Sequence, residues 1–257
     1  MIIKNTLLKA ANEAGKILKE NFGGSFKISS KDVVSNLVTE IDKQSEEKIF
    51  EIIKKDFPGH YILSEEAGAL AQDSEYKWII DPIDGTVNYA HSIPLTCVSI
   101  AVEKNEEVIM GVVYNPLSGE FFFAEKNAGA FLNDKKISVS KTSELDRSLL
   151  VTGFPYDSST YTPDPVSVFK KFIMKNVPIR RLGSAALDLC WTACGRFEGF
   201  WEYNLNAWDV AAGYLILLEA GGTVTDFKGE KYSIYGKEIL ATNGLIHQQM
   251  LNVLMEE

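Results

Sequence analysis

Apolar side chains recur at steps of three and four over residues 3–22, which predicts an amphipathic helix with one buried face. A polar segment follows over residues 25–38, where a loop or a weak hairpin is plausible. A second helix is predicted to open at Thr39, a good N-cap, with Asp42 three residues later as in a capping box. The apolar positions of the two helices are Leu7, Ala11, Ala14, Leu18 and Phe22, and Ile41, Ile49, Ile52 and Ile53.

Strand patterns dominate the next part of the chain. Residues 61–63 form a short apolar run, and residues 78–80 form a second. The second run stops at Pro82, where we expect a turn because proline has no N–H to donate to a ladder. Residues 69–76 are predicted to be an exposed loop. Short runs joined by tight turns then predict an antiparallel meander. These runs are residues 96–103, 108–114, 120–124 and 131–137.

The last part of the chain alternates strands with helices. This alternation after a run of short strands predicts a mixed α/β protein of stacked layers. We expect one domain over residues 1–257, with an α+β lobe over about 1–145 and an α/β lobe over about 146–257. Strands are predicted at 148–152, 197–203, 224–226 and 239–242, helices at 166–174, 184–195, 210–220 and 246–255, and a Pro- and Ser-rich loop at 154–165.

Composition narrows the functional classes. Of 257 residues, 46% are hydrophobic and 24% are charged, as in an ordinary globular protein. No stretch is long and apolar enough for a membrane span, and the charged N-terminus does not resemble a signal peptide. Three cysteines make no disulfide framework, so a cytoplasmic location is expected. The net charge of −9 makes broad attraction to nucleic acid unfavourable.

The chemistry of the chain centres on the segment D-P-I-D-G-T at residues 81–86. Asp81 and Asp84 are two carboxylates on a stiff turn beside Gly85, which lets backbone N–H groups approach a ligand. Hard divalent cations bind oxygen ligands of this kind. An ordinary turn explains the same residues equally well. An EF-hand loop is excluded because its ligand spacing fails from the third position onward.

Three further acids occur at the ends of predicted elements. Glu65 follows a short buried strand that could lie beside the segment 81–86. Asp42 and Asp209 each lie near the start of a predicted helix, where a carboxylate is favourable with or without any other function. Two cysteines of the helix 184–195, Cys190 and Cys194, lack further ligands at metal-binding spacing and are interpreted as core thiols.

Several separated motifs together resemble the inositol monophosphatase family. They occur in the expected order and span nearly the whole chain, so chance similarity is a poor explanation. The resemblance implies a five-layered αβαβα sandwich and Mg²⁺-dependent hydrolysis of a phosphate monoester. The motifs are N-L-V-T-E-I-D at 36–42, S-E-E at 64–66, D-P-I-D-G-T at 81–86, W-D-V-A-A-G at 208–213 and E-A-G-G at 219–222.

The resemblance also implies a set of metal ligands. Glu65, Asp81 and the main-chain carbonyl of Ile83 would hold a first Mg²⁺ ion. A second ion would be held by Asp81, Asp84 and Asp209, and a weaker third ion could lie near Glu65. Two metal ions of this kind stabilise the attacking and leaving oxygens and lower the pKa of a bound water.

Further roles are carried over from the family in the same way. Thr86, paired with Asp42, would help Glu65 to orient and deprotonate the attacking water. Asp84 and the backbone N–H groups of Gly85 and Thr86 would contact the phosphate. No Ser, Cys or His nucleophile is required. The alcohol part of the substrate would meet Gly183, Ser184, Ala185 and Glu202.

One departure and several alternatives remain. Many relatives have an acid where this chain has Asn36, which affects the third metal site.

The resemblance favours inositol monophosphate as substrate. The alternatives are fructose 1,6-bisphosphate, activity on both of these substrates, or a nucleotide 3′-phosphate. A catalytically dead relative would lack metal acids, yet all are present. The expected partner is a small phosphorylated polyol or sugar, without nucleic acid or membrane, and a homodimer is usual in such families.

Overall fold

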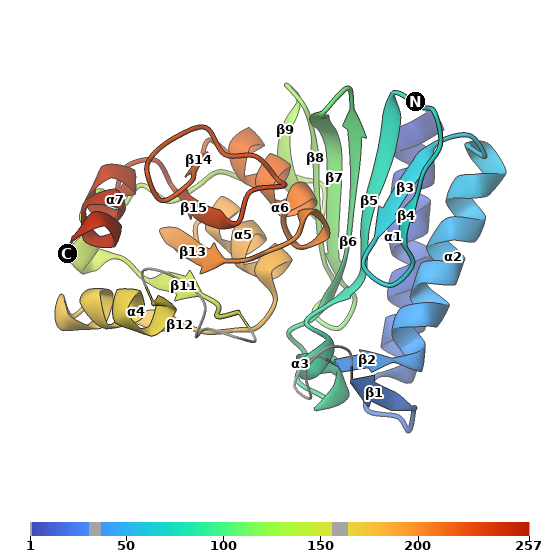
Figure 1. The fold of residues 1–257 in the computed structure, drawn as a ribbon, viewed down its shortest axis with the longest axis horizontal. Helices are drawn as coiled ribbons and strands as arrows, with labels where there is room; N and C mark the ends of the chain where they lie inside the picture. The colour runs from blue at the N-terminus through green and yellow to red at the C-terminus, as the bar shows by residue number, and fades with distance from the viewer. Residues whose placement is uncertain (1, 31–36, 156–163, 257) are drawn as a thin grey trace.

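The computed structural model describes residues 2–30, 37–155 and 164–256. Its elements stack in five layers, helix, sheet, helix, sheet and helix, as Figure 1 shows from right to left. Three apolar clusters fill the space between these layers. One lies between the outer helix pair and the large sheet, one surrounds the central helices, and one lies between the smaller sheet and the last helices. The expected αβαβα sandwich is therefore confirmed.

The first layer consists of α1 (Ile2–Asn21) and α2 (Glu40–Asp56), which pack against each other and against the large sheet. Thr39 caps α2, and the Asp42 carboxylate accepts the Thr39 N–H at 2.7 Å, which completes the predicted capping box. The polar segment before α2 does contain a hairpin, formed by β1 (Ile28–Ser30) and β2 (Leu37–Thr39). Residues 31–36, including Asn36, lie outside the described residues.

The large sheet has the strand order β10-β9-β8-β7-β6-β5-β3-β4. β3 and β5 are parallel, whereas the other neighbouring strands of the sheet pair antiparallel, as the meander predicts. The strands are β3 (Tyr61–Ser64), β4 (Gly68–Leu70), β5 (Tyr76–Asp84), β6 (Cys97–Lys104), β7 (Glu107–Asn115), β8 (Glu120–Glu125), β9 (Gly129–Leu132) and β10 (Lys135–Lys136).

Two expectations for this sheet are wrong. The segment 69–76 is not all loop, because β4 pairs antiparallel with β3 at the sheet edge. The chain also does not turn at Pro82, since β5 continues to Asp84. Its register with β6 shifts between Asp81 and Asp84, and β3 has already ended at Ser64. The missing N–H of Pro82 therefore falls in an irregularity, where proline is tolerated.

The central layer holds α5 (Ala185–Ala193) and α6 (Ala207–Glu219), between the large sheet and a five-stranded sheet of order β12-β11-β13-β15-β14. α6 is apolar on nearly all sides because both faces are covered. It approaches β7 so closely that a Cβ at Gly111 would lie 2.9 Å from the Ala212 Cα. The strands are β11 (Leu150–Thr152), β12 (Ile179–Arg180), β13 (Gly199–Tyr203), β14 (Thr223–Thr225) and β15 (Glu238–Thr242).

The last layer contains α4 (Pro165–Met174) and α7 (His247–Met255), which contact each other on the far side of the smaller sheet (Figure 1). A short 3₁₀ turn, η1 (Leu145–Arg147), precedes β11. The short helix α3 (Thr86–Ala90) directly follows β5 and was not anticipated from the sequence. Among the described residues, no helix combines the length and apolar character that crossing a membrane requires.

Candidate active site

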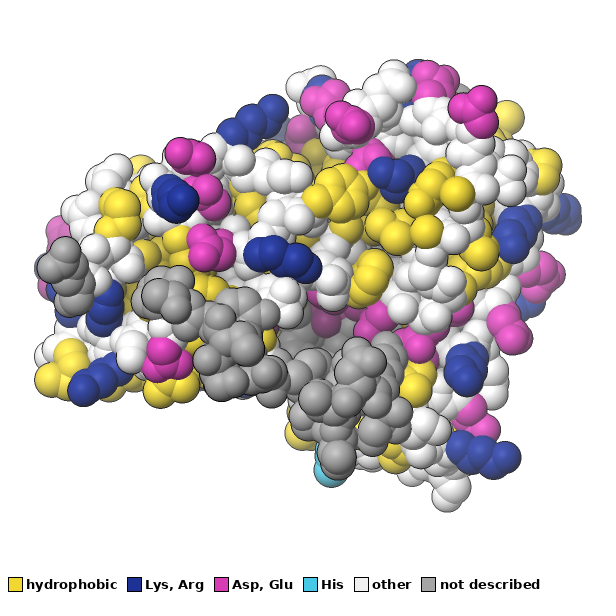
Figure 2. Space-filling view, viewed as in Figure 1, with side chains coloured by type: hydrophobic (Ala, Val, Ile, Leu, Met, Phe, Trp, Pro, Cys, Tyr) yellow, Lys and Arg dark blue, Asp and Glu magenta, His cyan; other side chains and the backbone are white. Residues whose placement is uncertain are grey.

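The site begins where two parallel strands end side by side. Ser64 of β3 is in register with Ile80 of β5, and the N–H of Glu65 donates to the Ile80 carbonyl at 3.1 Å. Glu65 and Asp81 therefore leave neighbouring strands at the same sheet end, and their carboxyl groups interact directly. Acidic side chains also line a hollow between the two halves of the molecule in Figure 2. The fold thus brings together two acids that are 16 positions apart.

The irregular end of β5 presents three groups. Oδ1 of Asp81 accepts the N–H of Ile83 at 3.0 Å, which fixes the bend of the chain around Pro82. The Ile83 carbonyl lies 2.9 Å from the Thr86 hydroxyl at the start of α3. Asp81 is 1% exposed and Asp84 is 8% exposed, so both carboxyl groups are largely removed from water. Hydrogen bonds within the chain therefore hold this end of the strand in place.

Asp84 joins β5 to the start of α5, 100 positions later. Its Oδ2 accepts the Ser184 hydroxyl and the Ala186 N–H, both at 2.7 Å, and lies 3.8 Å from the Cys97 sulfur. Ser184 is the N-cap of α5, as predicted. Its hydroxyl meets Asp84 directly, and the neighbouring Ala185 N–H also acts on that carboxylate. Two of the predicted substrate residues thus lie against a predicted metal ligand.

Asp209 enters the site from the first turn of α6. It is not the N-cap of this helix: Asn206 holds that position, and Asp209 is the third residue of the capping box. Its Oδ2 accepts the Asn206 N–H at 2.6 Å. The Ser99 hydroxyl of β6 donates to the Trp208 carbonyl at 3.3 Å, which ties this turn to the large sheet. Capping engages one oxygen of Asp209 and does not exclude a second role.

Negative charges dominate the electrostatics of this cluster. Burial raises the pKa of Asp81 well above its ordinary value, and the charges of Glu65, Asp84 and Asp209 raise it further. Burial is also the main cause that raises the pKa of Asp209, and the charges of Glu65 and Asp84 raise it further. Burial raises the pKa of Asp84 to about 6, although bonds from Ser184 and α5 oppose the shift. Carboxylates so close together are stable in the ionised form only if a cation neutralises them.

Thr86 and Asp42 meet on the other side of the β5 end. The Thr86 hydroxyl lies 3.1 Å from Oδ1 of Asp42, while Thr39 donates to Oδ2 through both its N–H and its hydroxyl. Burial raises the pKa of Asp42, and the bonds from Thr39 lower it. The Thr86 hydroxyl has one hydrogen and two acceptors, Asp42 and Ile83, so its oxygen lone pairs remain free to accept from a further group.

Gly85 has a left-handed backbone at a position that leaves no room for a side chain. Its φ is +88°, and a Cβ there would lie 2.8 Å from the Leu95 carbonyl and 3.2 Å from the Gly183 carbonyl. Gly183 also has a positive φ, +87°. The amide of Asn88 donates to the Leu95 and Leu182 carbonyls, each at 2.8 Å, and holds these loops together. Asn88 was not singled out from the sequence.

Glu202 lies on β13, is 9% exposed, and has a pKa of about 8 because burial outweighs the nearby charge of Arg181. The charge of Asp84 raises that pKa further. Sequence reasoning missed a second buried acid, Asp188 of α5, which is 1% exposed. A single charge within the apolar run A-A-L-D-L-C-W was the available signal.

The donor set fits a hard divalent cation. It consists of carboxylates and a backbone carbonyl, which are the oxygen ligands that Mg²⁺ prefers, and the nearest strong charges on Asp81 are all negative. Within residues 2–30, 37–155 and 164–256, no three His, Cys, Asp or Glu side chains already form a closed metal-binding group. Asp84 instead points to α5, and Asp209 to Asn206.

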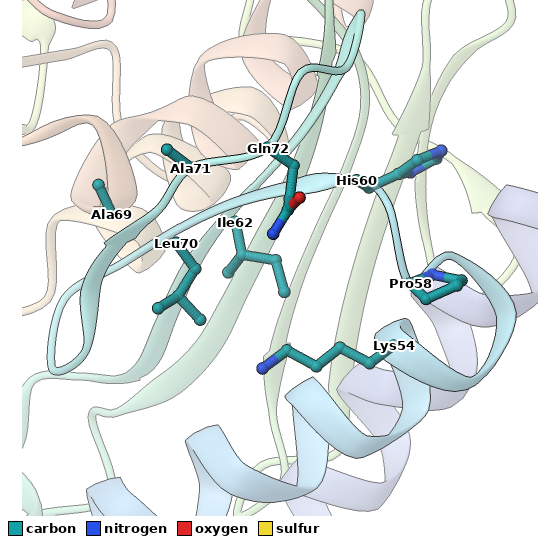
Figure 3. Close-up of a pocket in the computed structure, with 8 residues that line it drawn as sticks. All are labelled: Lys54, Pro58, His60, Ile62, Ala69, Leu70, Ala71 and Gln72. Atoms are coloured by element: carbon teal, nitrogen blue, oxygen red, sulfur yellow. The ribbon is translucent and has the colours of Figure 1, made fainter.

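A cavity of about 400 Å³ lies elsewhere, between α2 and the β3–β4 edge of the large sheet (Figure 3). It contains none of the predicted site residues. Lys54 extends toward it from α2, while the His60 ring is stacked between Phe57 and Tyr76, with centroid distances of 4.6 and 4.9 Å. Its lining residues are Lys54, Pro58, His60, Ile62, Ala69, Leu70, Ala71 and Gln72.

Comparison with known proteins shows the family of this chain. The model of the inositol monophosphatase family matches residues 3–257, and the chain belongs to that family. It is accordingly a phosphatase. An inositol-1-monophosphatase from Synechocystis is 44% identical over 254 residues, which cover 97% of this chain and 88% of that protein.

Two further similarities bear on function and fold. A Haemophilus influenzae protein named Nus factor SuhB is 40% identical over 250 residues, covering 96% of this chain and 94% of that protein. The solved structure of inositol monophosphatase from Anabaena is 43% identical and has a TM-score of 0.87, covering 98% of this chain and 94% of that chain. The fold is therefore shared over nearly the whole of both chains.

Proposed function

We propose that this phosphatase hydrolyses inositol monophosphate to inositol and phosphate in a reaction that requires Mg²⁺. The observation that carries the proposal is the convergence of Glu65, Asp81, Asp84 and Asp209 on one sheet end, where their charges act on one another. An acidic site can accept a phosphate only if cations compensate the repulsion. Family membership supports a metal-dependent phosphatase in general, and the choice of Mg²⁺ rests on the oxygen donors.

The metal-holding residues would be Glu65, Asp81, Asp84, Asp209 and the carbonyl of Ile83. When bound, two such ions neutralise the phosphate oxygens and make a nearby water more acidic. A third ion near Glu65 belongs to the same proposal. The capping bonds of Asp209 and the bonds from α5 to Asp84 orient these carboxylates without using every oxygen.

The chain's own residues would then position the water. Thr86 gives its hydrogen to Asp42, so its oxygen accepts a hydrogen bond from the attacking water. Glu65, at the adjacent strand end, takes the proton that the water loses. The backbone N–H groups of Gly85 and Thr86 would contact the phosphate, at a turn that needs glycine because a Cβ at position 85 would lie 2.8 Å from the Leu95 carbonyl.

The inositol ring would be bound on the side of α5 and β13. Gly183, Ser184 and Ala185 form the turn that enters α5, and Gly85 lies directly against this turn. Glu202 supplies a carboxyl group to the ring hydroxyls. These residues bind the part of the substrate that does not react, so we assign them to substrate choice rather than to the chemical step.

The test is phosphate release from a substrate panel by metal-stripped protein, with and without added Mg²⁺. We expect turnover of inositol monophosphate above that of fructose 1,6-bisphosphate and nucleotide 3′-phosphates, full loss in chelator, and inhibition by lithium. Undiminished turnover in chelator would reject the metal proposal. Preference for another substrate would reject the inositol assignment alone. Sedimentation of the same sample would test the expected homodimer.

A second candidate function comes from the relative named Nus factor SuhB. Its 40% identity covers nearly the whole of both chains, so this chain could serve in the same capacity. Gel filtration of the purified chain with the other Nus factors of its host would test this. Co-elution that persists in an Asp81→Asn variant would separate the binding role from the phosphatase.

A further inference from the structure

One face of α2 carries three buried polar side chains, Asp42, Ser45 and Glu46. Positions three and four residues apart lie on the same side of a helix, so these side chains share one face. Asp42 contacts Thr86. A helix face that packs against a sheet usually carries apolar side chains, and a buried carboxylate is costly unless it is hydrogen-bonded. The partners of Ser45 and Glu46 are therefore informative.

Glu46 bridges the short connection between β3 and β4. Its Oε1 accepts the hydroxyl of Ser64, the last residue of β3, and also accepts the N–H of Ala67 at 3.1 Å. Glu65 and Glu66 are the two residues between these donors. A single carboxyl oxygen, on a side chain that is only 7% exposed, therefore holds the chain on both sides of Glu65.

The same face of α2 also contacts the end of β5. The fully buried Ser45 donates its hydroxyl to the carbonyl of Pro82 at 3.0 Å, and Pro82 directly follows Asp81. Ser45 and Glu46 are adjacent residues of one helix, and its internal hydrogen bonds make their spacing nearly fixed. α2 thus holds the turn after β3 and the end of β5 at a fixed position relative to each other.

We propose that Glu46 is a positioning residue, which holds the turn that carries Glu65 beside the end of β5 so that Glu65 and Asp81 bind the same metal ion. A carboxylate suits this role because it forms stronger hydrogen bonds than a neutral acceptor and so restricts the turn more tightly. The inference rests on the proposed function, in which Glu65 is a metal ligand and the base, and it deepens that function.

Glu46→Leu and Glu46→Gln test this role. Leucine removes the acceptor with little change in size, whereas glutamine keeps a neutral acceptor oxygen. In Glu46→Leu we expect the dissociation constant for Mg²⁺, measured by calorimetric titration without substrate, to rise about 10- to 100-fold. The amide hydrogens of residues 65–68 should exchange faster with solvent in the metal-free protein, because the turn opens more readily. Glu46→Gln should restore most of both properties.

Thr6→Val is the matched control. Thr6 is a buried residue of α1 whose hydroxyl donates to Oδ2 of Asp56 at 2.6 Å, at the opposite end of α2. Its replacement also removes a hydrogen bond to a carboxylate of α2, so the melting temperature should fall. Mg²⁺ affinity and exchange at residues 65–68 should not change. If Glu46→Leu does not fold, Ser64→Ala takes its place, because it removes the same bond from the β3 side.

Two outcomes would overturn the inference. One is an unchanged Mg²⁺ affinity in Glu46→Leu, whatever happens to its melting temperature. The other is an equal loss of Mg²⁺ affinity in Glu46→Leu and Thr6→Val, which would assign the effect to general destabilisation. Failure of the proposed function is distinguishable, because the unmodified protein itself would then bind no Mg²⁺ or would keep its turnover in chelator.

Discussion

The hydroxyl of Thr86 lies 3.1 Å from Oδ1 of Asp42, although the two residues are 44 positions apart. The same Asp42 carboxylate caps α2 through its other oxygen, so one side chain both caps the helix and contacts a candidate site residue. This sharing explains why a capping interpretation of Asp42 and a catalytic one need not compete. A substitution that removes the partner of only one of these two oxygens can therefore change activity without changing stability, or the reverse.

Replacing Thr86 with alanine tests the proposed role of its hydroxyl in the reaction. The change removes the hydroxyl but leaves the capping bonds between Thr39 and Asp42 intact. We expect kcat to fall about 10²- to 10⁴-fold, the range for loss of a positioned proton-transfer group. Melting in chelator should change little. Thr86→Ser, which keeps the hydroxyl, should retain most of the activity, and equal losses in both variants would contradict the assignment.

Asp209→Asn separates a metal ligand from a capping residue. Asparagine can still accept the Asn206 N–H, so the melting temperature without metal should stay near that of the unmodified protein. Activity should fall roughly 10²-fold or more because a full charge leaves the cation site. Excess Mg²⁺ should restore only part of it. A variant with unchanged kcat would leave Asp209 as a capping residue alone.

The raised pKa of Glu202 predicts that the stability of the protein depends on pH. Its pKa in the folded protein is about 8, above the ordinary value of 4.5, so its protonated form is favoured by folding. Its contribution is fully present below about pH 4.5 and is lost as pH rises through about 8. Glu202→Gln should therefore melt higher than the unmodified protein at pH 8, with a smaller difference near pH 5. Thermal melts in chelator across this range would measure it, and a constant difference would contradict it.

Tyr235 links the loop before β15 to the large sheet. Its hydroxyl donates to the buried Glu103 at 2.6 Å and accepts from Lys77 at 2.7 Å. Tyr235→Phe should lower the free energy of unfolding by about 1–3 kcal/mol, because it removes a hydrogen bond to a charged group. The control is Tyr61→Phe, whose ring lies 5.5 Å beneath the Lys77 amine. Chemical denaturation of both variants should show a loss only at Tyr235, with kcat unchanged.

Much of the fold follows from local patterns. Helical periodicity predicts α1 to within a residue, and α2 begins after Thr39 with the expected capping box. Such features depend on contacts within one or two turns, so neighbouring residues suffice to predict them. The motif around Asp81 and Asp84, together with the other separated motifs, likewise indicates the family and the candidate acids from residue type and order along the chain.

Contacts between distant segments were decided by tertiary structure alone. β5 continues past Pro82 because β3 has ended and β6 tolerates a register shift there, neither of which the proline reveals. The bond between Ser184 and Asp84, and the burial of Asp188, require the packing of α5 on both sheets. The sequence by itself determined which residues could act, because residue type limits chemistry. Only the packed layers determined which of them meet, since burial and pairing depend on partners far along the chain.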